Sequence, residues 1–433
     1  MSKSLPKSLP NANVQWLTTR SAEDAVREVT ELFASEFGGE SGGESGGTSA
    51  QPEGVWSAPG RVNLIGEHVD YAGGISVPFA LSQRTYVAAR ANGTNDYRVA
   101  SLFDGEVSRT TVGLDEIGPG NPSDWSGYVV GTIWAAIEAG VLPAQGLDLA
   151  IVSDMPVGAG LSSSAALECS AGVAAVETGG VELEEANRTA LMNAAIRAEN
   201  EVVRASTGGL DQRISLFGQE GHALAIDFAK DSTKQVQFAI AERGLAVLIM
   251  NTNAPHSLAD GQYASRRAVI DGVTEDLGVS SLRYAEDAEA QSQRWAANNV
   301  PEGTDPEEWA ATVAKRVRHV VSEIDRTAKA IEQLEAGDIV GFGKSMQASH
   351  ASLRDDYEVT VPELDVAVEV AMAQGALGAR MTGGGFGGSA IALIDAERVE
   401  STAQAVADAF AERGFAAPEF AVALPSDGAR RDR

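Results

Sequence analysis

The stretch from residue 147 to residue 180 constrains the fold more than any other part of the chain. It runs from the alternating apolar segment LDLAIVSDM into the glycine loop PVGAGLSSSAALE at 156–168, and on to the glycine pair at 179–180. The alternation predicts a strand, and the loop opens a helix that begins at about Ser162 and stops at the glycine pair. A helix that begins in this way exposes unpaired backbone N–H groups, which attract anions. The stretch therefore predicts a mixed α and β fold with an anion site.

This loop differs from the two familiar phosphate-binding loops. It lacks the Gly-Lys-Ser/Thr ending of the P-loop and the third glycine of the dinucleotide-binding fingerprint. A lysine is dispensable, because a helix N-terminus carries roughly half a positive charge and can hold a phosphate by itself. Gly158 and Gly160 let the backbone approach a bulky anion, and a serine hydroxyl of the first turn could ligate Mg²⁺. An ordinary serine-capped helix after a tight turn is the alternative interpretation.

Length and charge limit the classes of protein to which the chain can belong. At 433 residues it exceeds the usual size of one domain, so we expect two domains with a cleft between them. The formal net charge of −28 disfavours nucleic acid and membranes as partners, so a phosphate substrate must be neutralised locally. No apolar run is long enough for a signal peptide or a membrane span, and we expect a cytoplasmic protein. The single cysteine, Cys169, excludes an internal disulfide and is expected to be a small buried residue.

The N-terminal segment, residues 1–54, combines a helix with a linker. Residues 21–37 have helical spacing, with Ser21 as the N-cap and Asp24 three positions later, in a pattern that resembles a capping box. The repeat GGESGGESGG follows without an apolar residue, and we interpret 38–54 as a flexible linker. We therefore expect an N-terminal helix that is loosely tethered.

The remainder is expected to form the two domains. Strand-like runs alternate with helical patterns such as 126–139 from Val55 onward, and a second strand-like run, LAVLIMNTNA at 245–254, opens the later half. We place one domain at 55–230 and the other at 231–433. The terminal SDGARRDR is expected to be loose.

The stretch APGRVNLIGEHVDYAGG, at 58–74, concentrates Arg61, Glu67, His68 and Asp70 beside glycines. Carboxylates and an imidazole that project from a turn suit a ligand with many hydroxyl groups, because each can accept or donate in a fixed direction. A solvated surface turn is the alternative interpretation.

Two later stretches add acids and glycines. In GGLDQRISLFGQ, Asp211 follows two glycines, and Glu199 lies twelve positions earlier on a helical run. One carboxylate could hold a cation while the other receives or orients a substrate proton, although either alone also fits a surface acid. The glycine-dense TGGGFGGS at 382–389 is costly to order, which favours a close approach of backbone to a ligand.

These glycine-rich stretches, in this order, resemble the motifs of the GHMP small-molecule kinases. GRVNLIGEHVDYAGG resembles the signature of the branch that phosphorylates galactose, PVGAGLSSSAAL the ATP-binding motif, and MTGGGFGGSAIAL the third motif. With GGLDQ and NTNAPHSLADGQYASRR, the resemblance extends from about Val55 to about Asp395. It implies an α+β fold of two domains, a ribosomal-protein-S5-like N-terminal domain and a ferredoxin-like C-terminal domain, with the active site between them. It also implies transfer of phosphate from ATP to O1 of α-D-galactose. The resemblance leaves the oligomeric state open, and we expect a monomer.

The resemblance assigns the ATP side of the site. Trp125 and Tyr128 are expected near adenine, and the Ser164 hydroxyl and the Glu199 carboxylate are expected to hold Mg²⁺. The triphosphate is expected on the loop and the helix start, formed by Gly158, Ala159, Gly160, Leu161, Ser162, Ser163, Ser164 and Ala165.

The resemblance also assigns the sugar side. Asp211 corresponds to the acid beside the anomeric hydroxyl, Arg61 to the guanidinium near it, and Asp70 to the group near O3 and the axial O4. An arginine beside Asp211 favours its carboxylate form and can stabilise charge on the transferring phosphoryl group. Further contacts to sugar hydroxyls are expected from Glu67, His68, the backbone of Gly208, and Tyr263.

Other functions within the fold remain open, and two features depart from the family pattern. Rival substrates are N-acetylgalactosamine, arabinose and mevalonate, although the EHVDY cluster favours a sugar over mevalonate. A galactose sensor without catalysis is a different class, but such relatives are disrupted in the Gly/Ser loop that is intact here. The departures are the linker at 38–54 and Arg213, which occupies a position that is usually apolar or aromatic.

Overall fold

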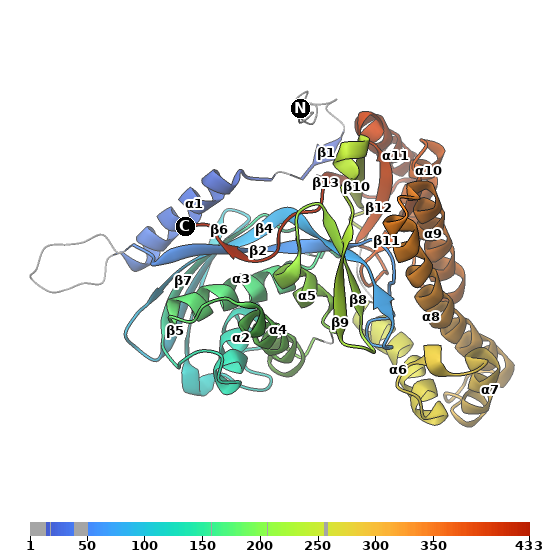
Figure 1. Ribbon diagram of the computed structural model, residues 1–433, viewed down its shortest axis with the longest axis horizontal. Coiled ribbons are helices and arrows are strands. Elements are labelled where there is room, and N and C mark those ends of the chain that lie inside the picture. Colours follow the sequence, from blue (N-terminus) through green and yellow to red (C-terminus); the bar gives the residue numbers. More distant parts are fainter. Residues whose placement is uncertain (1–13, 18, 39–50, 157, 206, 255–258) are drawn as a thin grey trace, which may run out of the picture.

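The computed structural model describes residues 14–17, 19–38, 51–156, 158–205, 207–254 and 259–433. Most of the predicted linker at 38–54 therefore lies outside the described residues. The described chain forms three sheets, and two of them, each with its own helices, make up the two halves seen in Figure 1.

The larger sheet belongs to the N-terminal half. In spatial order its strands are β14 (Arg430–Arg431), β2 (Gly54–Asn63), β4 (Pro78–Ala91), β7 (Leu147–Ser153), β5 (Asp96–Phe103) and β6 (Glu106–Gly113). All neighbours are antiparallel except β5 and β7, which are parallel. Both faces are covered, and for this reason β2 is buried along its whole length and shows no polar alternation.

Helices cover the two faces of this sheet. Figure 1 shows α1 on one face and the other four helices on the opposite face. These helices are α1 (Ala22–Phe37), α2 (Ser126–Glu138), α3 (Ser163–Thr178), α4 (Glu185–Arg197) and α5 (Leu210–Phe217). The predicted helices at 126–139 and from about Ser162 are confirmed, and α3 ends at Gly179. A π-helical turn, η2 (Ala198–Val203), follows α4.

Helix α1 begins as predicted but is not loosely tethered. The Ser21 hydroxyl accepts a hydrogen bond from the backbone of Asp24, which is the expected cap. Along one stripe of the helix, Ala25, Val29 and Phe33 are fully buried against strands β4 and β7. The expected loose tether is therefore wrong, because the apolar stripe packs into the core.

The second sheet belongs to the C-terminal half and is buried on both faces. In spatial order its strands are β1 (Gln15–Trp16), β13 (Glu419–Ala423), β10 (Leu245–Asn251), β12 (Ser389–Asp395) and β11 (Gly378–Thr382). The predicted strand at 245 is confirmed as β10. Its alternate side chains enter two different cores, Leu248 under the C-terminal helices and Val247 toward the N-terminal half.

Six helices belong to the C-terminal half. They are α6 (Ala259–Leu277), α7 (Ala288–Asn298), α8 (Pro306–Glu335), α9 (Ile339–Ser352), α10 (Pro362–Ala373) and α11 (Val399–Arg413). Shorter helical turns occur in both halves. In the N-terminal half there is η1 (Leu114–Glu116), and the later ones are η3 (Ile240–Arg243), η4 (Leu282–Tyr284), η5 (Leu353–Tyr357) and η6 (Ala396–Arg398). A small antiparallel sheet of β3 (Ile75–Ser76), β8 (His222–Asp227) and β9 (Ser232–Gln237) completes the fold.

Each end of the described chain joins the sheet of the opposite half. Strand β1 lies parallel to β13, and β14 lies antiparallel to β2. The stretch SDGARRDR, predicted to be loose, is therefore ordered. The Ser426 amide donates to the Ala80 carbonyl at 2.9 Å and the buried Ala429 donates to the Ser215 carbonyl at 2.7 Å.

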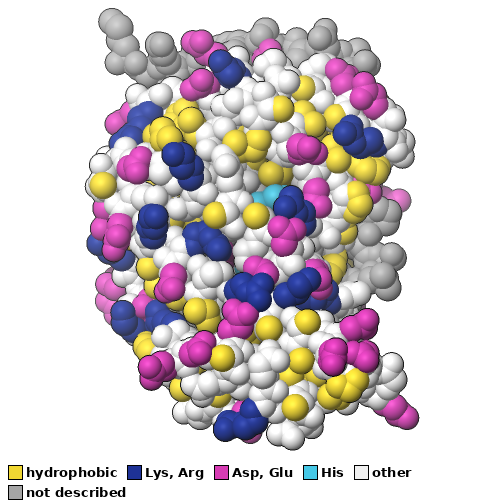
Figure 2. Space-filling model, turned by 90° about the vertical axis from the view of Figure 1, so that its right-hand side faces the viewer, with side chains coloured by type: hydrophobic (Ala, Val, Ile, Leu, Met, Phe, Trp, Pro, Cys, Tyr) yellow, Lys and Arg dark blue, Asp and Glu magenta, His cyan; other side chains and the backbone are white. Residues whose placement is uncertain are grey.

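The outer surface of the C-terminal half carries charges of both signs. On the face drawn in Figure 2, basic and acidic side chains are interspersed with scattered apolar ones. Such a mixture is typical of a surface that faces water. Within the described ranges, no helix is both long and apolar enough to cross a membrane.

Candidate active site

The start of α3 is open because its serines are engaged elsewhere. Gly158, Gly160 and Ser162 all have positive φ, at 77°, 71° and 60°, so the loop turns sharply before the helix. The N-cap residue Ser162 makes no cap bond with its side chain, and its hydroxyl donates instead to Asp211. The Ser164 hydroxyl donates to Glu199 Oε1 at 3.2 Å. The alternative of a plain serine cap is therefore wrong, and the first N–H groups of α3 can serve an anion.

Arg61 on β2 grips Asp211 in the first turn of α5. Its Nε and Nη2 donate to the two Asp211 carboxylate oxygens at 2.9 and 3.2 Å. Its Nη1 donates to the Gly160 carbonyl at 2.6 Å, which ties the pair to the loop before α3. A paired guanidinium of this geometry holds a carboxylate in one orientation. The predicted catalytic pair is thus assembled beside the predicted phosphate site.

Glu199 joins this group from the π-helical turn. The Gln212 amide nitrogen donates to Glu199 Oε2 at 2.6 Å and to Glu168 Oε2 at 2.8 Å. Burial, and then the nearby charge of Asp211, raise the pKa of Glu199 to about 7. Burial also raises the pKa of Glu168 well above its ordinary value. Gln212 and Glu168 were not singled out by the sequence, although Gln212 directly follows Asp211 in GGLDQ.

A polar cavity of about 190 Å³ brings the predicted sugar residues together. It lies between the two halves, because Tyr263, Gly383 and Gly384 of the C-terminal half close one side. The other lining residues are Arg61, Gly66, Glu67, His68, Asp70, Glu199, Thr207, Gly208, Leu210 and Asp211.

Glu67 links the cavity wall to the third glycine loop. Its Oε2 forms an ion pair with Arg380 at 2.8 Å and accepts a hydrogen bond from the Asn63 side chain at 3.0 Å, and its Oε1 accepts from the Gly383 amide at 3.0 Å. Burial raises the pKa of Glu67, and the charge of Arg380 opposes that shift. Two hydrogen bonds and one ion pair thus fix this carboxylate, and both of its oxygens can accept a further hydrogen bond from a ligand.

Asp70 and Gly208 meet closely at the cavity floor. A Cβ atom at Gly208 would lie 2.0 Å from Asp70 Oδ2, so the position requires glycine. Burial, and then the charge of Asp211, raise the pKa of Asp70 to about 6. Asp70 is therefore a carboxyl poised to change charge near neutral pH.

His68 is held by protein groups on both ring nitrogens. Nε2 lies 3.1 Å from the Gly384 carbonyl and Nδ1 lies 3.2 Å from the Tyr71 hydroxyl, which in turn lies 2.7 Å from the Tyr357 hydroxyl. Burial, and then the charge of a second histidine, lower the pKa of His68 to about 3, so the ring is neutral. The ring of Tyr263 packs at 5.3 Å from that of His68.

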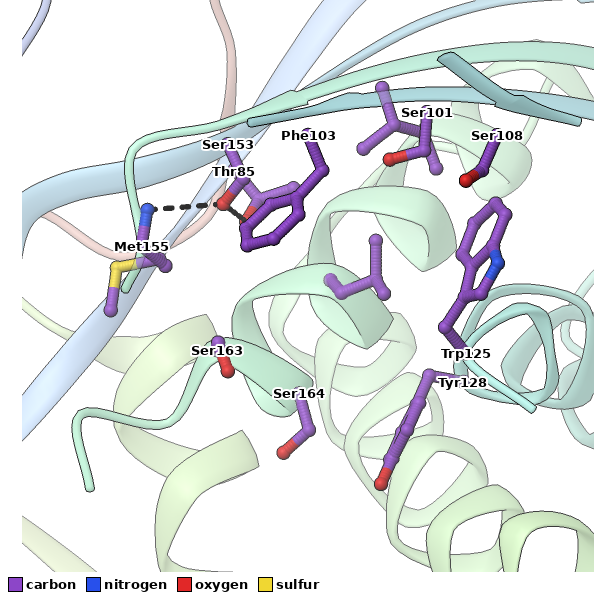
Figure 3. Close-up of a pocket in the computed structure, with 12 residues that line it drawn as sticks. Thr85, Ser101, Phe103, Ser108, Trp125, Tyr128, Ser153, Met155, Ser163 and Ser164 are labelled. Atoms are coloured by element: carbon purple, nitrogen blue, oxygen red, sulfur yellow. Dashed lines mark hydrogen bonds between the residues drawn. The ribbon is translucent and has the colours of Figure 1, made fainter. Parts of the chain in front are cut away.

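A second, largely apolar cavity of about 350 Å³ adjoins the start of α3. Figure 3 shows Trp125 and Tyr128 along one wall and Ser163 and Ser164 at the end nearest the helix start. The flat aromatic walls and the scarcity of charge suit a nucleobase. The ring of Phe103, at the end of β5, projects into this cavity, and the sequence reading missed it.

Arg213 points away from the reactive groups. Its guanidinium pairs with Asp231 and lies 5.8 Å from the ring centre of Phe228. The departure from the family pattern at this position therefore leaves the surroundings of Asp211 intact.

Three family models match this chain. The GHMP kinases N terminal domain covers residues 127–219, the GHMP kinases C terminal model covers 330–412, and the Galactokinase galactose-binding signature covers 44–91. The fold and the site, with an open helix start facing a cavity between two α/β halves, are thus those of a GHMP kinase. The predicted two-domain fold is confirmed.

Individual relatives narrow the class further. The galactokinase of Streptomyces coelicolor is 42% identical over 385 residues, which span 88% of this chain and 95% of that protein. The galactokinase of Canis lupus familiaris is 38% identical over 94% of this chain and 97% of its own. The crystal structure of Lactococcus lactis galactokinase complexed with galactose matches at a TM-score of 0.79 and 32% identity, over 94% of this chain and 99% of that one. The chain belongs to the galactokinase family.

A more distant structure shares the fold alone. A mevalonate kinase matches with a TM-score of 0.56 at 16% identity, over 87% of this chain and 98% of that one. The galactokinase relatives described above confirm the predicted family resemblance.

Proposed function

We propose that the protein transfers the γ-phosphoryl group of ATP to O1 of α-D-galactose, giving α-D-galactose 1-phosphate and ADP. The observation that carries this proposal is the position of Asp211. Arg61 donates hydrogen bonds to both oxygens of the Asp211 carboxylate. The carboxylate faces the polar cavity that Asp70 also lines, and it adjoins the open start of α3. An acceptor hydroxyl and a phosphate can therefore meet at one carboxylate.

Asp211 and Arg61 act on the acceptor hydroxyl. The Asp211 carboxylate accepts a hydrogen bond or the proton from O1, and Arg61 keeps that carboxylate oriented. Phosphoryl transfer needs mainly positioning and neutralisation of charge, so a fixed acid beside a guanidinium is a sufficient set of protein groups.

The residues at the start of α3 fit the triphosphate of ATP and Mg²⁺. Ser164 and Glu199 offer a hydroxyl and a carboxylate 3.2 Å apart, both oxygen ligands of the kind that Mg²⁺ prefers. Burial beside Asp211 raises the pKa of Glu199, and a cation there would restore its charged form. The described residues contain no group of three or more acids, histidines or cysteines placed to hold a metal, so phosphate oxygens and water would complete the shell. Bound there, Mg²⁺ would neutralise phosphate charge.

The loop 158–165 supplies backbone N–H groups to the phosphates, while Trp125 and Tyr128 contact adenine. On the sugar side, Asp70 accepts hydrogen bonds from O3 and the axial O4. The other hydroxyl contacts come from Glu67, Gly208 and Tyr263, and the His68 ring, whose two nitrogens are bonded to protein, packs against the sugar.

We also propose that the enzyme works as a cytoplasmic monomer on two small molecules, galactose and ATP. Residues of one chain line both described cavities, so a second chain is not needed to complete them. N-acetylgalactosamine or arabinose as acceptor, and a sensor without catalysis, are the alternatives that the experiment below separates.

A panel of acceptors tests the proposed reaction. Purified protein with Mg·ATP is incubated with galactose, glucose, N-acetylgalactosamine, arabinose or mevalonate; the phosphorylated product is measured by ³¹P NMR, and galactose binding is measured separately by calorimetry. Galactose should be preferred over glucose by about 10-fold to 100-fold or more, because the equatorial O4 leaves the half-buried Asp70 poorly paired. Equal efficiency on both hexoses would contradict the role of Asp70. Galactose binding without turnover would identify a sensor.

A further inference from the structure

The sugar-binding turn has a backbone that needs support from outside. Gly66 and His68 both have positive φ, at 87° and 59°, and His68 is not a glycine. A Cβ atom at Gly66 would lie 2.2 Å from the Ile75 carbonyl oxygen. The side chains of this turn point into the sugar cavity only while the backbone keeps its unusual conformation. The groups that stabilise that conformation therefore affect sugar recognition.

Glu323 of helix α8 holds the amide side of the turn. Its side chain is fully buried, and its Oε1 accepts from the Gly66 amide at 3.0 Å and from the Ser349 hydroxyl at 2.5 Å. Its Oε2 pairs with Arg326. A buried carboxylate that accepts from a backbone N–H fixes that peptide strongly, because the bond is assisted by charge.

His319, one helical turn earlier on α8, holds the carbonyl side. Its Nε2 lies 3.2 Å from the Glu67 carbonyl oxygen and its Nδ1 lies 2.9 Å from the Ser352 hydroxyl. The carbonyl can only accept, so Nε2 donates to it and Nδ1 accepts from Ser352. The ring also packs at 4.4 Å from that of Tyr357, whose hydroxyl continues through Tyr71 to His68.

We propose that Glu323 and His319 are positioning residues for sugar recognition. They fix the two peptide groups on either side of residues 66–67 and so aim Glu67 and His68 into the cavity. This inference rests on the proposed binding of galactose in that cavity. Neither residue lines the polar cavity or the apolar cavity beside the start of α3, so their loss should weaken galactose binding and spare ATP.

Two substitutions and one matched control test the proposal. Glu323→Gln keeps the side-chain length but replaces one carboxylate oxygen by an NH₂ group. That group is a donor and would face the Gly66 amide, the Ser349 hydroxyl or Arg326, which are themselves donors. His319→Phe keeps a ring against Tyr357 but removes the donor to the Glu67 carbonyl. Ser349→Ala removes another partner of the same Glu323 oxygen and leaves both bonds to the turn in place.

Galactose Kd by calorimetry, KM for each substrate and Tm are measured for all variants. Both test variants should raise the Kd and KM for galactose about tenfold with an unchanged KM for ATP, since the loss of a buried hydrogen bond has this order of effect. Ser349→Ala should lower Tm with galactose Kd unchanged. Folded Glu323→Gln or His319→Phe protein with the galactose Kd of the original chain would overturn the assignment. Failure of the original chain itself to bind galactose would instead refute the proposed function.

Discussion

Asp211 accepts hydrogen bonds from two side chains, Arg61 and Ser162, while facing the sugar cavity. Asp211→Asn keeps the size of the side chain but removes its charge and basicity. We expect turnover to fall by about 10²–10⁴-fold, the usual contribution of a general base. Steady-state kinetics measure this fall, and calorimetry measures galactose binding separately because Arg61 loses its counter-charge. Near-normal turnover in folded protein would refute the role.

Ser164 is proposed to act on the cation and not on the sugar. Its hydroxyl contacts Glu199, and its side chain makes no cap for α3. Ser164→Ala should therefore raise the Mg²⁺ concentration needed for half-maximal activity and lower turnover, while galactose Kd stays the same. Ser170→Ala, at a buried serine of the same helix that lines neither cavity, is the control. If the Mg²⁺ dependence is unchanged, Ser164 has no role as a ligand.

Asp70 gives the site a pH dependence with a defined sign. Its pKa is raised from the ordinary value of 3.8 to about 6, so the carboxyl takes up its proton as the pH falls through about 6. The proton removes an acceptor for sugar hydroxyls, so galactose Kd should rise below about pH 6, by at most about tenfold per pH unit, and level off above it.

Calorimetric titrations of galactose between about pH 5 and about pH 8 measure this dependence. Because Glu199 also titrates in this range, with a pKa of about 7, Asp70→Asn serves as the control. It should bind galactose weakly at every pH. A constant Kd for the original chain across the range would show that Asp70 does not bind the sugar as a carboxylate.

The sequence motifs predicted the residues that face the cavities. They did not predict the residues, such as Glu323, that hold the cavity-lining residues in place. Arg61, Asp70 and Asp211 stand beside glycines that permit close approach, and that pattern is local. Glu323 reaches Gly66 from 257 positions away, on a long amphipathic helix where it reads as one more charged residue. Such partners follow from packing, and no short-range pattern encodes them.

At the scale of elements, the sequence predicted helices where stop and start signals are strong. Glycines ended α3 at Gly179, and Ser21 capped α1. The predicted loose packing of α1 was wrong because the glycine repeat after the helix indicates only a flexible connection, not a free helix. The apolar stripe of Ala25, Val29 and Phe33 indicates a buried face, which a helix free in solvent would not need.

The repeat between α1 and β2 supplies a prediction at this scale. Residues 40–47 contain no apolar side chain, so their removal should take nothing from the core. We expect the shortened chain to keep its Tm and its turnover nearly unchanged, as measured by thermal melting and the galactose assay. A substantial loss of either would show that the segment packs on the protein or gates the site.

At the scale of the whole molecule, each end of the described chain pairs with the sheet of the opposite half, and this crossing could not be predicted from the sequence. Strand β14 has two residues, Arg430 and Arg431, and two residues show no alternation. Its pairing with β2 is set by contacts between distant segments. Arg84, buried in β4, donates to the carbonyls of Asp427 and Gly428 at 2.8 and 2.6 Å.

Removal of residues 426–433 should therefore destabilise the fold. Arg84 would lose two of its three carbonyl partners, and a buried group left unsatisfied costs about 1–3 kcal/mol or more. We expect the free energy of unfolding to fall by about 3 kcal/mol, measured by urea denaturation. Arg431→Ala, at a half-exposed side chain, is the control and should have a small effect. Unchanged stability after the truncation would contradict this account.

The pairing of β14 with β2 also determines when the N-terminal sheet can be completed during synthesis. Ser57 on β2 and Asp432 beside β14 bond across 375 positions of sequence. A ribosome adds about 5–20 residues per second, so the N-terminal sheet waits on the order of tens of seconds for the strand that covers its β2 edge. During that interval the nascent chain presents the open edge of a mostly apolar strand, a surface on which other chains can pair. The newly made protein is thus most exposed to misassembly just before its last strand arrives.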